Sequence, residues 1–167
     1  NYVEESCHSG SFNEKLYIGK REEVFVYNES TGNFDLFYHL AGKNITLSCL
    51  HLDKNKNLWM GTTSNGIYCL SEDKNLSRPV TKGNITSIYE DSSNELWIGS
   101  WEEGLYRVKT DGSIENLRHN PMNTNSLCSN FVRSCCEDNS GDLWIGTFNG
   151  LNRYDRETGK FHLYTAN

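Results

Sequence analysis

The chain has 167 residues, and its 16 lysines and arginines against 22 aspartates and glutamates give a formal net charge of −6. This acidic balance argues against a nucleic-acid partner, because binding to a phosphate backbone needs a basic surface. Aromatic residues make up 12% of the chain and only two prolines occur. The composition therefore favours a folded domain with a sizeable core over a disordered linker.

No apolar run approaches the roughly 20 residues that a membrane-spanning helix needs. The first residues are polar and acidic, unlike a signal peptide, and the chain does not begin with methionine. We therefore expect a piece of a longer protein, with any targeting or membrane segment outside it. The six cysteines lack the spacing of a zinc site, and a chain of this length does not need a disulfide framework. We interpret them as small buried side chains.

A five-residue motif occurs four times, at residues 16–20, 58–62, 96–100 and 143–147. Its aromatic positions are Tyr17, Trp59, Trp97 and Trp144, which lie 42, 38 and 47 residues apart, and its glycines are Gly19, Gly61, Gly99 and Gly146. A motif that returns every forty or so residues is typical of propeller blades with four strands. The predicted units are residues 1–40, 41–82, 83–118 and 119–167.

In chain order, each unit begins with a segment in which apolar and polar residues alternate, which predicts a first strand. These segments are residues 45–52, 85–90 and 131–136 in the second to fourth units. A polar turn follows, beginning at Asp53, Asp91 or Asp138, six residues before the tryptophan. The motif itself is the second strand. Its tryptophan faces one side and its Leu and Ile the other, so we expect sheets that are covered on both faces.

Third strands are predicted at residues 24–27, 66–70, 104–108 and 150–154, and fourth strands at 34–38, 78–80, 114–117 and 161–164. Pro79 indicates that the fourth strand is an outer edge, where a missing N–H donor does no harm. No segment shows a helical period. The sequence therefore predicts an all-β fold of four antiparallel meanders, that is, β-propeller blades in a single segment over 1–167, as a fragment of a larger propeller.

The stretch from Asp138 to Asp155 resembles the two-component regulator propeller repeat, and so do the connector at residues 119–127 and the ending at 158–161. The resemblance implies the periplasmic sensor region of a bacterial hybrid two-component histidine kinase. The ligands would be glycan fragments, and the response would control genes for polysaccharide use. The kinase, the regulator and the membrane contact would belong to the parent protein.

The loops between second and third strands are the predicted ligand-binding positions: Trp101, Glu102, Glu103, Phe148, Asn149 and Asn65. An exposed aromatic side chain beside carboxylates suits an oligosaccharide or a peptide; the alternative for Trp101 is a side chain folded over the next blade. The aromatic and glycine positions of the motif are expected to be core. The Asp turns lack the closing glutamate of a calcium loop, so we expect no metal, no cofactor and no catalytic set.

The favoured function is a non-catalytic ligand sensor. An enzyme on the propeller scaffold, of lyase or lactonase type, and a protein-interaction platform remain alternatives, because fold alone does not fix function. Four blades would leave an apolar face at each end. We therefore expect self-association through the end blades or a closed small ring, and a dimer in the parent protein.

Overall fold

The computed structural model describes residues 8–12, 15–41, 45–80 and 82–165. All regular secondary structure in these ranges is β-strand. The described residues include no helix that could cross a membrane.

The strands form four sheets of four. The first contains β1 (His8–Phe12), β2 (Lys15–Lys20), β3 (Glu23–Asn28) and β4 (Asn33–His39). The second contains β5 (Leu47–Leu52), β6 (Leu58–Thr62), β7 (Ile67–Leu70) and β8 (Leu76–Val80). The third contains β9 (Ile85–Glu90), β10 (Leu96–Ser100), β11 (Leu105–Val108) and β12 (Ile114–Leu117). The fourth contains β13 (Val132–Glu137), β14 (Leu143–Thr147), β15 (Gly150–Asp155) and β16 (Lys160–Tyr164).

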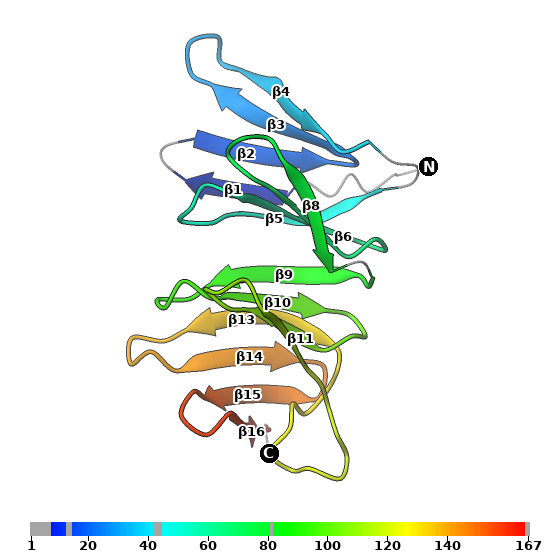
Figure 1. Cartoon of the computed structure of the whole chain (residues 1–167), viewed down its shortest axis with the longest axis vertical. Helices are drawn as coiled ribbons and strands as arrows, with labels where there is room; N and C mark the ends of the chain where they lie inside the picture. The colour runs from blue at the N-terminus through cyan, green and yellow to red at the C-terminus, as the bar shows by residue number, and fades with distance from the viewer. Residues whose placement is uncertain (1–7, 13–14, 42–44, 81, 166–167) are drawn as a thin grey trace. The chain divides into compact units, whose positions relative to one another are not determined.

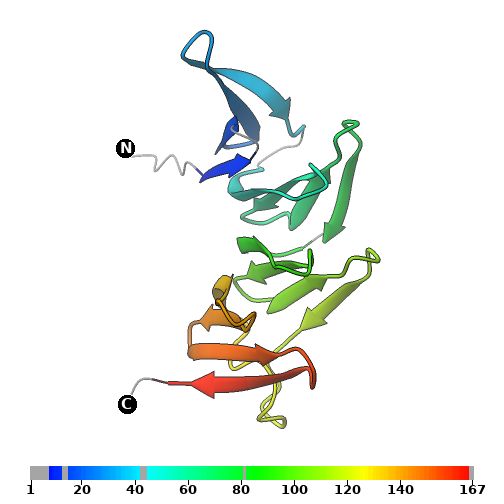
Figure 2. The ribbon, with the colours of Figure 1, turned by 90° about the vertical axis from the view of Figure 1, so that its left-hand side faces the viewer.

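Within every sheet the strands lie in chain order, and each pairs antiparallel with the next (Figure 1, Figure 2). The predicted all-β class and the four meanders are therefore confirmed. The chain divides into two compact units, Asn1–Asn84 and Ile85–Asn167, each with two sheets. In each unit the first strand of the later sheet, β5 or β13, contacts the first two strands of the earlier one.

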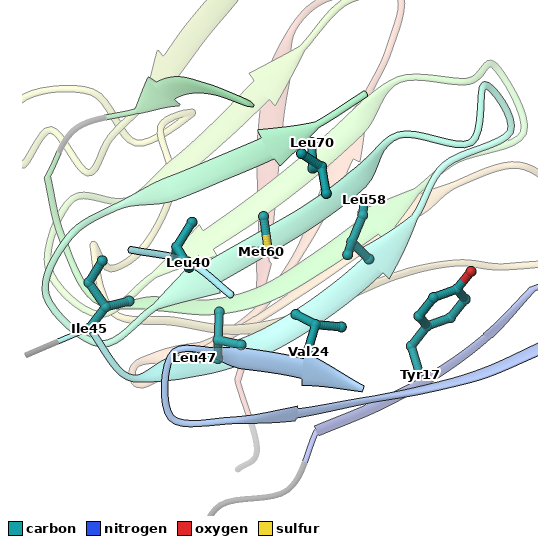
Figure 3. Close-up of a cluster of buried hydrophobic side chains, with 8 residues drawn as sticks. All are labelled: Tyr17, Val24, Leu40, Ile45, Leu47, Leu58, Met60 and Leu70. Carbon is teal, nitrogen blue, oxygen red and sulfur yellow. The ribbon is translucent and has the colours of Figure 1, made fainter. Parts of the chain in front are cut away.

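Two of the four motif strands, β6 and β10, lie at the centre of the packing. All five residues of β6 and of β10 are buried, which reflects their apolar side chains on both faces. In the first unit, Tyr17, Val24, Leu47 and Met60 belong to one buried cluster (Figure 3). The second unit has a separate cluster that includes the residues Trp97, Leu105, Leu127, Val132, Leu143, Ile145, Tyr154 and Phe161. Trp144 is only half-buried.

The motif glycine is a point of close approach. A Cβ at Gly99 would lie 2.8 Å from Cγ1 of Val132 in the next sheet and 2.6 Å from Oγ of Ser87, its cross-strand partner. The cross-strand partners of Gly61 and Gly146 are Cys49 and Ser134. The small residues ten positions before the motif aromatics thus lie opposite the glycines.

The turns follow the expected chemistry with one difference. In the turns after β5, β9 and β13 the left-handed residue is Lys56, Asn94 or Gly141, with φ of 62°, 63° and 83°. Asparagine and glycine adopt this conformation readily. Lys56 does not have that preference, and no sequence pattern indicated that the lysine, rather than its asparagine neighbours, would occupy the position.

β8 is the outermost strand of its sheet, as Pro79 indicates. Its pairing with β7 shifts register between Ile67↔Val80 and Cys69↔Ser77, so the proline lies in an irregular stretch that needs no ladder donor.

The interpretation of the cysteines as buried is only partly right. Among the described cysteines all five are free; Cys136 is exposed and the other four are half-buried. Cys7 lies outside the described residues.

Candidate functional site

A repeated hydrogen bond joins the polar turn to the motif strand. The indole Nε1 of Trp59, Trp97 and Trp144 donates to Oδ2 of the aspartate six residues earlier, at 2.8, 2.7 and 2.8 Å. The other carboxylate oxygen accepts the backbone N–H four residues after the aspartate. The aspartates at these turns therefore have a structural role. The spacing of six residues between aspartate and tryptophan was evident in the sequence, but the hydrogen bond between their side chains was not predicted.

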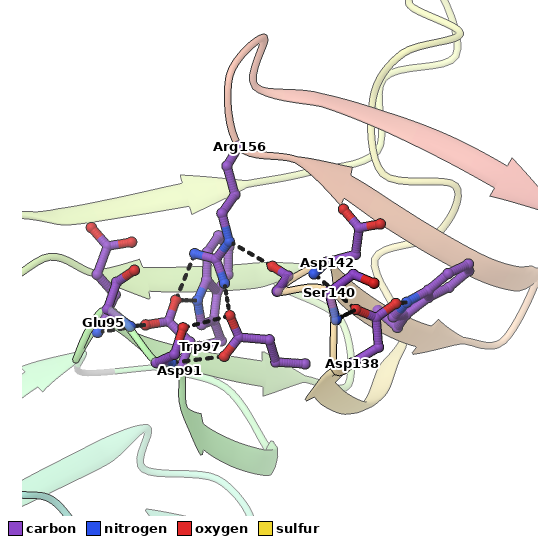
Figure 4. A network of polar contacts seen from close by, with 12 residues as sticks. Asp91, Glu95, Trp97, Asp138, Ser140, Asp142 and Arg156 are labelled. Carbon is purple, nitrogen blue, oxygen red and sulfur yellow. Dashed lines mark hydrogen bonds and ion pairs between the residues drawn. The ribbon is translucent and has the colours of Figure 1, made fainter.

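In the second unit, the hydrogen bond between Asp91 and Trp97 is part of a larger charged network (Figure 4). Arg156 follows β15 and reaches the third sheet, where its Nη1 lies 2.8 Å from Oδ2 of Asp91. Its Nη2 lies 3.1 Å from Oε1 of Glu137. The Asp91 side chain has no exposed surface. Burial alone would raise its pKa, but the hydrogen bonds from Trp97 and Arg156 outweigh this, and the pKa lies below its usual value.

A second arginine adjoins the same tryptophan. Arg107 pairs with Glu95 at 2.7 Å, and its guanidinium lies 5.1 Å from the centre of the Trp97 ring. Trp97 also contacts Tyr154 edge to face, with ring centres 5.1 Å apart. The space between the third and fourth sheets at this end is therefore filled by aromatic and ion-paired side chains.

At the other end of the second to fourth sheets, the last residue of the motif builds the loop to the third strand. The hydroxyls of Thr62, Ser100 and Thr147 donate to the carbonyls of Gly66, Gly104 and Gly150, respectively. The same oxygens accept a backbone N–H from the loop. These bonds hold the loops that carry the predicted ligand-binding residues, and the Thr or Ser at the end of the second to fourth motif copies was the signal for them.

The structure brings two of the predicted site residues into one aromatic row. Trp101 contacts Phe131 edge to face at 5.4 Å, and Phe131 lies 6.2 Å from Phe148. Arg133 lies 4.7 Å from the centre of the Trp101 ring. Trp101 is thus half-buried against residues of the following sheet, as its alternative interpretation has it, whereas Phe148 is 69% exposed. Phe131 and Arg133 were not among the predicted site residues.

The remaining predicted site residues take part in local contacts. Glu103 forms an ion pair with Arg118, which also donates to the backbone carbonyl of exposed Glu102. Asn149 is exposed beside Phe148. In the first unit, the backbone carbonyl of Asn65 accepts two hydrogen bonds from Arg78.

Among the described residues, no group of three or more His, Cys, Asp or Glu side chains could hold a metal ion. Three of the described histidines make contacts that are separate from one another. His39 lies 3.7 Å from Glu23, His119 is 2.8 Å from the carbonyl of Leu127, and His162 is 3.9 Å from Asp155.

Comparisons with solved structures identify propellers with the same blade architecture. A streptogramin B lyase structure aligns with a TM-score of 0.75 at 18% identity, over 96% of this chain and 54% of that one. The extracellular domain of a protein described as a one-component system from B. thetaiotaomicron gives 0.73 at 21% identity, over 88% and 20%. The extracellular domain of a protein from the same organism, described as a hybrid two-component system, gives 0.64 at 20% identity, over 90% and 26%.

The chain thus spans about half of the lyase structure and about a quarter or less of the other two. At these identities the likeness shows the fold alone. No curated protein sequence matches the chain.

Three stretches, residues 39–64, 79–102 and 126–149, match the family described as two component regulator propeller. Each contains the hairpin of first and second strands with the Asp turn and the motif. The resemblance seen in the sequence is confirmed: the chain carries repeats of the two-component regulator propeller family.

Proposed function

We propose that this chain is part of the extracytoplasmic, ligand-sensing propeller region of a bacterial hybrid two-component sensor, and that this region is not catalytic. The observation that carries the proposal is the threefold match to the two-component regulator propeller, each time on the same hairpin. The extracellular domains of one-component and hybrid two-component systems among the structural neighbours support it. In this proposal the kinase and the membrane anchor belong to a longer parent protein.

The ligand that we propose is an oligosaccharide, bound at the loops between second and third strands. Phe148 offers an aromatic face to solvent, and the aromatic row behind it, from Phe131 to Trp101, makes that face part of a rigid surface. Aromatic rings supply much of the contact energy of binding surfaces. Glu102 and Asn149, both exposed, provide polar groups beside them. A ligand signals only if it favours one arrangement of the receptor over another.

A panel of oligosaccharides from bacterial and plant polysaccharides, titrated calorimetrically into the full chain, tests the ligand. For a sugar that binds, Phe148→Ala is expected to weaken binding about tenfold, which corresponds to about 1.4 kcal/mol. Phe34→Ala is the matched control, because Phe34 is also exposed but lies on the outer strand β4. Binding that tolerates Phe148→Ala would contradict the placement, and a panel without any binder would favour a protein ligand.

The second candidate is an enzyme, favoured by the streptogramin B lyase among the structural neighbours. Such an activity needs acid–base or metal-binding side chains that converge on one point. Turnover of a lactone or ester substrate by the purified chain, lost on replacing a single His or carboxylate, would establish it against the sensor proposal.

A further inference from the structure

A cavity of about 360 Å³ lies between the first and second sheets of the first unit. Its residues are Lys15, Tyr17, Phe37, Leu52, Lys56, Leu58, Leu70, Ser71, Glu72 and Lys74. Of these, Tyr17, Leu58 and Leu70 belong to the buried cluster of the unit (Figure 3). The volume lies at the lower end of the range of about 300–1,000 Å³ that is usual for small-molecule sites.

Repeat register explains why a cavity occurs in this unit. Tyr17 occupies the motif position of Trp97. Leu70 occupies the position of Tyr154, because Leu70 pairs with Leu58 and Tyr154 pairs with Leu143, the first residues of their motif strands. In the second unit, Trp97 and Tyr154 are in ring contact and leave the region filled. The first unit has a smaller aromatic side chain at one position and an aliphatic one at the other.

Three further exchanges remove the ion pairs that close this region in the second unit. Arg156 there joins Asp91 and Glu137. By the same register, Glu72 stands in the place of Arg156 and Leu52 in that of Glu137, while the residue six before Tyr17 is a serine. At these positions of the described residues the first unit therefore cannot form the charged bridge, and Leu52 contributes an apolar side chain instead.

The rim of the cavity is positively charged. Three of its residues are lysines and one is a glutamate, in a chain of net charge −6. Lys56 pairs with Glu72 at 2.8 Å. The ammonium group of Lys74 lies 3.3 Å from the centre of the Phe37 ring, and partial burial lowers the pKa of Lys74. An anion near Lys74 and Lys15 would meet cationic groups, whereas a cation would be repelled.

We propose that this cavity binds a small organic anion with an aromatic or other apolar body. Its carboxylate would face Lys74 and Lys15, and its body would pack against Tyr17, Leu58 and Leu70. The cavity opens at the turns that follow β5 and β7, at the opposite end of the second sheet from the loop that carries Asn65. The proposal is therefore independent of the oligosaccharide site.

Titration of the full chain with phenylacetate, followed by nuclear magnetic resonance of the backbone amides, tests this inference. We expect saturable binding with a Kd on the order of 1 mM, and shifts centred on Tyr17, Leu58 and Leu70. The uncharged phenylacetamide is expected to bind at least about fivefold more weakly, and phenethylamine more weakly still. No binding of phenylacetate, indole-3-acetate or hexanoate up to about 10 mM, or equal binding of acid and amide, would overturn the proposal.

Variants separate the two parts of the site. Leu70→Tyr introduces the residue that fills the corresponding place in the second unit and is expected to abolish binding. Lys74→Gln is expected to weaken phenylacetate severalfold without changing phenylacetamide. Lys160→Gln, which removes an exposed lysine outside the cavity, is the matched control. If Leu70→Tyr does not fold, as judged by circular dichroism, Lys74→Gln still decides: unchanged affinity for the acid would contradict the inference.

Discussion

At the residue scale, Asp91 is held by hydrogen bonds at both of its carboxylate oxygens. Its Oδ2 accepts from Trp97 and Arg156, and its Oδ1 accepts from the backbone N–H groups of Ser93 and Glu95. Both oxygens thus face donors only. An amide in place of the carboxylate would turn an NH₂ group toward one of these donors, whichever way it pointed.

Asp91→Asn is therefore expected to lower the free energy of unfolding by about 2–4 kcal/mol, because it also leaves half-buried Arg156 with one partner fewer. Urea unfolding of the purified chain measures this. Asp138→Asn is the matched control: Asp138 binds its tryptophan and turn in the same way but is exposed and has no arginine partner like Arg156. An equal loss in both variants would show that the network around Arg156 adds nothing.

The same carboxylate predicts a pH dependence. The pKa of Asp91 in the folded chain lies below its ordinary value of 3.8, so its contribution to stability is complete above that value and is lost as the pH falls through the lowered pKa. The difference in unfolding free energy between the wild type and Asp91→Asn should therefore be constant near neutrality and shrink in acid. Urea unfolding from about pH 6 to about pH 2.5 follows it. A difference that grows on acidification would contradict the sign.

At the element scale, the motif strand depends on the missing side chain of its glycine. A Cβ at Gly99 would meet Val132, which is fully buried and cannot move aside. Among the described residues, the side chain within reach of a Cβ at Gly146 is that of Ser134, whose hydroxyl can rotate. Gly99→Ala is expected to destabilise the chain by about 1–3 kcal/mol, and Gly146→Ala by less than about 1 kcal/mol. Thermal unfolding compares the two; equal losses would mean that the neighbouring sheet does not limit this position.

Strand order and hairpins could be predicted because the motif, the alternation and the turn residues all point to the same meander. The second strands of the second to fourth sheets have the predicted bounds. What could not be predicted depends on contacts between sheets. Arg156 and Asp91 are 65 residues apart, and nothing in either local sequence pairs them. The aromatic row is similar: Trp101 and Phe148 lie in recognisable loops, but Phe131 between them was predicted as part of a first strand and not as a site residue.

At the scale of the whole molecule, the fourth sheet has a face with exposed apolar side chains, which favours association with a partner. Trp144 is half-buried, whereas Trp97 is fully buried, and Tyr164 and Leu151 on the same face are 47% and 41% exposed. Tyr164 also contacts Trp144, with ring centres 5.3 Å apart. In the repeat architecture such a face packs against a further blade, because each blade buries its apolar residues against its neighbours.

We therefore expect the isolated chain to self-associate through this face. Sedimentation equilibrium should show species larger than a monomer, and Leu151→Asp should shift the distribution toward monomer because association would then bury a charge. Met122→Asp is the matched control, since Met122 is 92% exposed in the connector before the fourth sheet. If the wild type stays monomeric at about 100 μM, at which contacts of micromolar affinity would be populated, or if both variants associate alike, the fourth sheet is not the interface. Loss of association in Leu151→Asp alone would assign this face to the next blade of the ring.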